Sequence, residues 1–121
     1  YYGDVWSDLE DFEASLAKVR DEDAEFYVTF HHKGVIEGRD AFVEMVDAFT
    51  SVIGRRHDAM LEFLREPHTL DEMRRHRFIY RPHVEMAFVE SVERRSAELH
   101  VQRMLRRGEA AEVAPGRFQT T

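Results

Sequence analysis

Cysteine is absent from this 121-residue chain, and both proline, with 3 residues, and glycine, with 6, are scarce. Without cysteine, disulfides and thiolate metal sites are excluded, and the redox compartment stays undetermined. No apolar run approaches the roughly 20 residues that span a bilayer, and no signal peptide opens the chain. No Gly-rich phosphate loop or nucleophile motif occurs. The sequence therefore predicts a globular chain without membrane contact, for which a cytoplasmic location is the default expectation.

Charge is distributed unevenly along the chain. Residues 1–50 hold 13 acidic side chains against 4 lysines and arginines, whereas residues 51–121 hold 11 against 13. This asymmetry predicts two regions, 1–50 and 51–121, with different surroundings. The chain opens on Tyr1 and Tyr2, which resemble folded interior more than a natural start. We therefore interpret it as part of a longer product.

One helix and one strand are expected in the acidic region. Ser7 and Glu10 match a capping box, with Ser7 as the N-cap, and apolar residues at helical spacing extend the helix to about Arg20. The aromatic and β-branched segment 25–30 predicts a single strand. Because a lone strand leaves its backbone groups unpaired, the chain either supplies other strands whose pattern is poor, borrows them from another subunit or has lost them. An exposed apolar edge strand also favours pairing with another copy, so we expect self-association through residues 1–50.

Three further helices and a hairpin are expected in the rest of the chain. They are predicted at residues 40–65, 70–77 and 83–107, with the hairpin at 110–119. Gly54 suggests a bend or boundary in the first of these helices. Thr69 opens a second capping box, and Gly108 ends the last helix. This order predicts a mainly α (α+β) chain in which residues 57–119 form a winged-helix domain.

Three motifs stand in a characteristic order. They are Tyr1-Tyr2-Gly3-Asp4 followed by Ser7–Phe12, then His31-His32-Lys33-Gly34-Val35-Ile36 after the strand, and Leu105-Arg106-Arg107-Gly108 before the hairpin. Together they resemble the C-terminal part of metallo-β-lactamase-fold hydrolases that carry a C-terminal winged-helix domain. The resemblance implies that residues 1–50 are a helix–strand remnant of the metallo-β-lactamase domain with the start of a linking helix, and that residues 51–121 are the winged-helix domain.

The same resemblance places His32 at the position of the family's last metal ligand. It implies zinc and a metal-bound hydroxide nucleophile in the parent enzyme. Since successive strand residues point to opposite faces, His31 and His32 cannot both face one metal. The family's His-x-His-x-Asp-His motif is missing, so the chain itself is interpreted as catalytically incomplete, with catalytic residues unknown and a small-molecule substrate bound only by the parent. One histidine predicts zinc binding no tighter than about micromolar, and hence no cofactor on this chain alone.

The last helix is basic and suggests a different function. Its arginines are Arg94, Arg95, Arg103, Arg106 and Arg107. In a DNA-binding winged helix, such a helix enters the major groove. Acidic residues lie among these arginines and the chain carries a net charge of −7, whereas nucleic-acid binders usually present a cleaner basic face. Two alternatives to the hydrolase stay open: a winged-helix DNA-binding regulator with an N-terminal dimerisation arm, and a structural interaction module.

Overall fold

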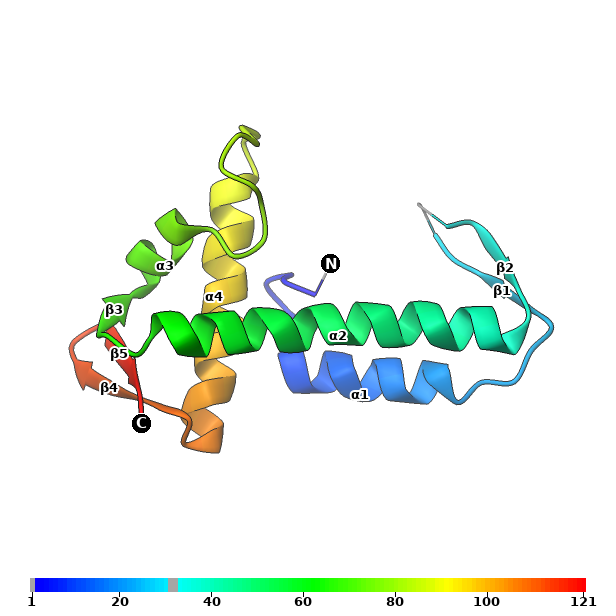
Figure 1. The fold of residues 1–121 in the computed structure, drawn as a ribbon, viewed down its shortest axis with the longest axis horizontal. Coiled ribbons are helices and arrows are strands. Elements are labelled where there is room, and N and C mark those ends of the chain that lie inside the picture. The colour runs from blue at the N-terminus through cyan, green and yellow to red at the C-terminus, as the bar shows by residue number, and fades with distance from the viewer. Residues whose placement is uncertain (1, 31–32) are drawn as a thin grey trace.

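The computed structural model describes residues 2–30 and 33–121. Over these residues the chain forms four helices and two small antiparallel sheets, so it belongs to the α+β class with helix predominating. The long helix α2 (Arg39–Phe63) spans the molecule; α1 (Leu9–Arg20) lies along it and α4 (Val89–Arg107) crosses it (Figure 1). No helix in the described part of the chain is long and apolar enough to cross a membrane.

Helix α1 begins one residue later than its expected cap predicts. Asp8, rather than Ser7, is the N-cap, and its carboxylate accepts the backbone N–H groups of Glu10 and Asp11 at 2.9 and 3.2 Å. The assignment of Ser7 was wrong because a carboxylate at Asp8 provides the same acceptor together with a negative charge that the helix N-terminus favours. The helix ends at Arg20, as expected.

The predicted strand has a partner within the chain. Strand β1 (Phe26–Val28) pairs antiparallel with β2 (Val35–Glu37). The N–H and hydroxyl of Thr29 both donate to the carbonyl of Gly34, at 2.7 and 2.9 Å. Gly34 and Gly38 have φ of 66° and 88°, so the backbone adopts positive φ just before and just after β2. The chain thus supplies the partner strand itself, which was one of the three alternatives, although the sequence pattern did not reveal β2.

Helix α2 joins the two ends of the molecule. It is continuous through Gly54, so the bend expected there is not observed and a division at residue 51 falls inside one helix. Near its start, Phe42 and Val46 pack on Tyr27 of β1, with the rings of Tyr27 and Phe42 stacked at 3.8 Å. Near its end, Met60 belongs to the core that includes α3 and α4.

A three-stranded sheet lies at the end of α2. The remaining elements are β3 (His68–Thr69), α3 (Leu70–His76), β4 (Ala110–Ala114) and β5 (Arg117–Thr120). The predicted capping box of Thr69 and Glu72 and the left-handed cap at Gly108 are confirmed. The predicted hairpin is also confirmed, and β3 adds to it in the order β3-β5-β4. The sequence did not reveal β3 because it is two residues long.

Helix α4 starts at Val89, not near His83 as predicted. The preceding loop, residues 77–88, is held in a non-helical course at two points. The guanidinium of Arg77 donates to three loop carbonyls, those of Arg81, Pro82 and Val84. The buried carboxylate of Glu93 accepts the backbone N–H groups of Phe78, Ile79 and Tyr80 at 2.7–2.9 Å. Among these groups, the carbonyls of Pro82 and Val84 are ones that the first turn of a helix from His83 would have used.

The buried side chains form three clusters along the molecule. The cluster at the crossing of α2 and α4 contains Tyr2, Leu9, Ile53 and Leu99, with Phe12 and Leu16 packed against it. In this cluster, the N-terminal segment and α1 pack against α2 and α4. The acidic N-terminal region is therefore packed onto the basic last helix rather than separated from it.

Candidate functional site

The predicted metal ligand, His32, lies outside the described residues, as does His31. Among residues 2–30 and 33–121, no group of three or more histidine, aspartate or glutamate side chains is close enough to hold a metal. The described side chains therefore do not fit a zinc site by themselves, and we assign no catalytic step to a metal in this chain.

Glu72 contacts His68 and Arg117, both at 3.3 Å, and caps α3.

The predicted nucleic-acid residues of α4 are brought together on one helix but are engaged within the chain. Arg95 donates to the backbone carbonyls of Asp4, Val5 and Ser7 at 3.1–3.3 Å. Arg103 is buried, with its side chain 3% exposed, and forms an ion pair with Glu13 of α1. These two arginines hold the N-terminal segment and α1 against α4.

The more exposed arginines of α4 also have acidic partners. Arg106 pairs with Asp8 at 3.1 Å, and Arg107 with Glu10 at 3.0 Å. The backbone N–H of Asp11 is the largest cause of the lowered pKa of Asp8, and the Arg106 guanidinium lowers it further. Arg94 lies 3.9 Å from Glu98 on the same helix. The acidic residues of the N-terminal region and the arginines of α4 are thus largely paired with each other. This pairing weakens the positive electrostatic field that nucleic acid would meet.

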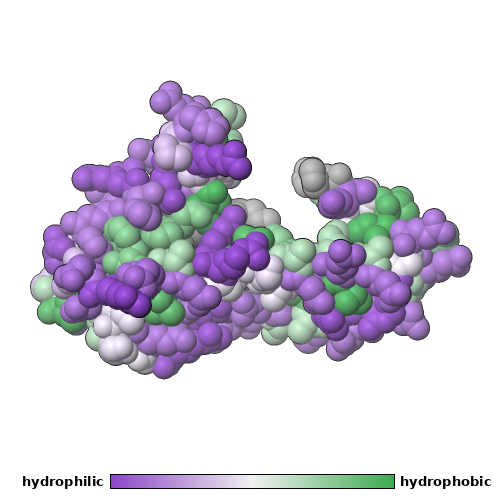
Figure 2. All heavy atoms as spheres, in the orientation of Figure 1, coloured by the Kyte–Doolittle hydropathy of each residue, from purple (hydrophilic) through white to green (hydrophobic). Residues whose placement is uncertain are grey.

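An apolar surface occupies the other end of the molecule. Figure 2 shows apolar atoms gathered where the β1–β2 hairpin meets α2. Among the large hydrophobic residues exposed there, Phe30 and Val28 are 89% and 81% exposed, and Phe26 and Val35 are also exposed. Trp6, 93% exposed, precedes α1. Single exposed apolar residues are ordinary, but several on one hairpin suggest an interaction surface.

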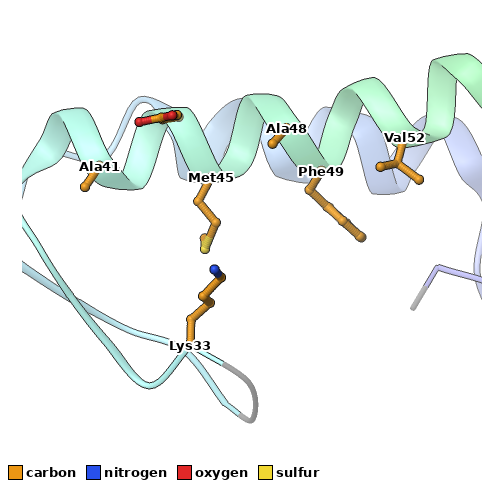
Figure 3. Close-up of a pocket in the computed structure, with 7 residues that line it drawn as sticks. Lys33, Ala41, Met45, Ala48, Phe49 and Val52 are labelled. Atoms are coloured by element: carbon orange, nitrogen blue, oxygen red, sulfur yellow. The ribbon is translucent and has the colours of Figure 1, made fainter.

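A groove of about 530 Å³ lies between this hairpin and α2. In Figure 3, Met45 of α2 and Lys33 of the hairpin point toward each other, and Phe49 extends from α2 further along the groove. The groove is lined by Lys33, Ala41, Glu44, Met45, Ala48, Phe49 and Val52. The hairpin residues and this groove are referred to below as the hairpin surface.

A buried histidine pair was not anticipated from the sequence. Nδ1 of His57 on α2 lies 3.1 Å from Nδ1 of His100 on α4, and Nε2 of His57 lies 2.8 Å from a carboxylate oxygen of Glu109. The hydroxyl of Tyr2 lies 3.1 Å from Nε2 of His100. No sequence spacing signals this contact, because the two histidines come from different helices.

Buried His100 makes stability depend on pH. Burial is the largest cause that lowers the pKa of His100 from 6.5 to about 3, and the nearby His57, Arg103 and Arg56 add to it. As the pH falls below about 6.5, the unfolded side chain takes up a proton while folded His100 stays neutral. The contribution of His100 to the free energy of unfolding is therefore fully present above about pH 6.5 and decreases as the pH falls toward 3. Each pH unit in this window is expected to lower the free energy of unfolding by about 1.4 kcal/mol.

Urea denaturation at about pH 7 and about pH 4.5 measures this slope. Replacing His100 with glutamine is expected to flatten it, while His83→Gln, at an exposed loop position, should leave it unchanged. An identical slope in both variants would contradict the assignment to His100.

Comparison of the chain with protein-family models, with curated proteins and with solved structures gave no match. The function is therefore argued from the residues and their arrangement.

Proposed function

We propose that this chain is the C-terminal region of a metal-dependent hydrolase of the metallo-β-lactamase superfamily, and that it braces the catalytic part without performing the chemistry. The hairpin surface is the observation that carries this proposal. It combines exposed apolar residues of the β1–β2 hairpin with the groove along α2. In the sequence, these hairpin residues flank the His31-His32 pair that resembles a ligand motif. An upstream catalytic domain packed on this surface would bury Val28 and Val35, which are exposed in the chain alone.

We propose further that residues 51–121 of this region form a winged-helix domain, and the order of the C-terminal elements supports this. Helix α2 leads through β3 to α3 and α4, and β4 and β5 follow as a hairpin, in the sheet order β3-β5-β4. This order resembles the helix–strand–helix–helix–hairpin order of winged helices and supports the proposal. The 77–88 loop replaces the 3–4-residue turn of a helix-turn-helix. That replacement and the paired arginines favour a structural role over groove reading.

The reading frame upstream of Tyr1 tests the hydrolase proposal. We expect it to encode a His-x-His-x-Asp-His motif, and we expect His32→Ala in that longer protein to lower both bound zinc and hydrolytic turnover. His83→Gln is the matched control. An upstream frame without the motif, or full zinc occupancy and turnover in the His32 variant, would overturn the proposal.

The isolated chain is expected to self-associate through the hairpin surface. Replacing Val28 and Val35, opposite each other in the hairpin, by threonine keeps β-branched side chains but removes apolar area. We expect this double variant to dimerise at least about tenfold more weakly, since the loss corresponds to roughly 1.4 kcal/mol. Sedimentation equilibrium measures the change. Val113→Thr, an exposed strand valine in the other sheet, should have no effect. If the unsubstituted 121-residue chain is monomeric, the prediction of self-association is wrong.

DNA binding distinguishes the regulator alternative. Because the arginines of α4 are paired with acidic residues of the chain, we expect only weak, salt-sensitive DNA binding without sequence preference. Affinities for random and selected duplexes at several salt concentrations measure this. Nanomolar binding of a selected duplex in physiological salt would favour the DNA-binding regulator instead.

A further inference from the structure

Four polar side chains form an unbroken chain through the crossing of α2 and α4. They run from the Tyr2 hydroxyl to His100, from His100 to His57, and from His57 to Glu109, with atom separations of 3.1, 3.1 and 2.8 Å. His100 is fully buried, and Tyr2 and His57 are nearly so. Glu109 is the end that reaches solvent. This set is called the histidine relay below.

The chemistry of the four groups determines the direction of every hydrogen bond. An ionised Glu109 carboxylate can only accept, so Nε2 of His57 must donate to it. Neutral His57 then has a bare Nδ1, which must accept from Nδ1–H of His100. Neutral His100 in turn has a bare Nε2, which must accept from the Tyr2 hydroxyl. All three bonds therefore point from Tyr2 toward Glu109.

The charges around the relay differ between its two ends. The groups that face it are Arg56 on α2, Glu93, Ser96 and Arg103 on α4, and Glu13 of α1 through its ion pair with Arg103. Arg56 donates to the Tyr2 hydroxyl at 3.4 Å, so a cation already occupies that end. The Glu109 carboxylate lies beside His57. An added positive charge is therefore stabilised on His57 and opposed on His100.

We propose that the histidine relay is a one-proton switch. Protonation of His57 reverses two hydrogen bonds, the one between His57 and His100 and the one between His100 and Tyr2. Compared with the neutral relay, the switched relay has taken up one proton from solvent and has a new N–H bond at Nε2 of His100. The N–H bond at Nδ1 of His100 breaks, and its proton forms an N–H bond at Nδ1 of His57. The net result is one added proton, an imidazolium at His57 and the opposite neutral tautomer at His100. No electron is gained or lost.

Every ring nitrogen keeps a partner in the switched state. His57 donates to Glu109 and to Nδ1 of His100, and Nε2–H of His100 donates to the Tyr2 oxygen. The Tyr2 hydrogen must then find a new acceptor. Beside it, Ser96 Oγ is buried, lowers the pKa of Tyr2 as a hydrogen-bonding neighbour, and has no other hydrogen-bond partner among the described residues. This hydroxyl provides the acceptor that the reversal requires.

The relay holds either no extra proton or one. A second proton would place a charge on buried His100 between the His57 imidazolium and the guanidiniums of Arg56 and Arg103, and the low pKa of His100 reflects that cost. The switch thus connects Glu109, just before β4, with Tyr2 in the N-terminal segment. It is independent of the hydrolase proposal, because it uses none of the residues near His32.

Nitrogen-15 NMR of the histidine side chains reads the two states directly in the intact chain. At neutral pH we expect Nδ1–H on His100 and Nε2–H on His57. As the pH is lowered, we expect the second N–H of His57 and the change of His100 to Nε2–H to appear together in one step, with His100 remaining uncharged. Nε2–H on His100 before the step, or separate titrations of the two rings, would overturn the proposal.

A charge-removing variant tests the role of Glu109. Glu109→Gln retains an oxygen acceptor for His57 but removes the carboxylate charge, so we expect the step to move to lower pH by at least about one unit. Glu37→Gln, on β2 at the far end of α2, removes the same charge and should not move the step. An equal shift in both variants, or none in Glu109→Gln, would show that Glu109 does not govern the relay.

Discussion

Replacing Glu93 by alanine is expected to lower the free energy of unfolding by about 4 kcal/mol, because three backbone donors lose one ionised acceptor. The Glu93 carboxylate accepts the N–H groups of Phe78, Ile79 and Tyr80, and the side chain is 1% exposed. Without it, the loop before α4 has lost one of its two anchors. Urea denaturation at neutral pH measures the change.

Two further variants make this result specific. Glu93→Gln retains Oε1, which serves Ile79 and Tyr80, so we expect about half of the loss. Glu90→Ala, one turn earlier on the same helix and mostly exposed, should change stability by less than about 0.5 kcal/mol. Equal losses for Glu93 and Glu90 would show that the buried carboxylate does not hold the loop.

Replacing Arg103 by methionine is expected to lower the free energy of unfolding by about 3 kcal/mol, since it removes one partner of a largely buried ion pair. Its guanidinium bonds Glu13 and reaches the carbonyl of Leu9 at 3.5 Å, so the contact of α1 with α4 depends on it. Methionine keeps the length of the apolar stem. Denaturant unfolding, with protease sensitivity of residues 9–20, measures the loss and locates it.

The exposed arginines of α4 serve as controls for this prediction. Arg106→Ala and Arg107→Ala break ion pairs that are nearly half exposed on both sides, and each should cost no more than about 0.5 kcal/mol. A loss at Arg103 as small as these would mean that the arginine does not hold α1. Reduced DNA affinity in the exposed variants at unchanged stability would assign them a nucleic-acid role instead.

The uneven distribution of charge along the sequence did not reveal that the acidic and basic regions contact each other. An excess of acid in residues 1–50 and of base in α4 suggested separate surroundings for two regions. In the structure, Asp8, Glu10 and Glu13 pair with Arg106, Arg107 and Arg103, so the two regions face each other. Composition reports the charges of each segment but not the contact between them, because the partners are separated by some 90 residues or more.

The errors in element boundaries share one cause. The start of α4 was placed near His83 because residues 83–88 resemble a helix by local pattern. The bonds that prevent it come from Arg77 behind and Glu93 ahead, and only the folded loop brings them together. The partner of the first strand was missed for the same reason, since three residues of β2 carry no period of their own.

The sequence by itself determined the features that close within a few residues. Thr69 and Glu72 cap α3, Gly108 ends α4 in the left-handed conformation, and the turn before β5 has Gly116 at φ 69°. Each depends on bonds or torsions inside one turn, where residue type and spacing are sufficient. Tertiary structure alone decided that His57 meets His100 and that Arg103 is buried against α1. These contacts join side chains 43 and 90 residues apart, and only the crossing of the helices creates the water-free surroundings that give them their chemistry.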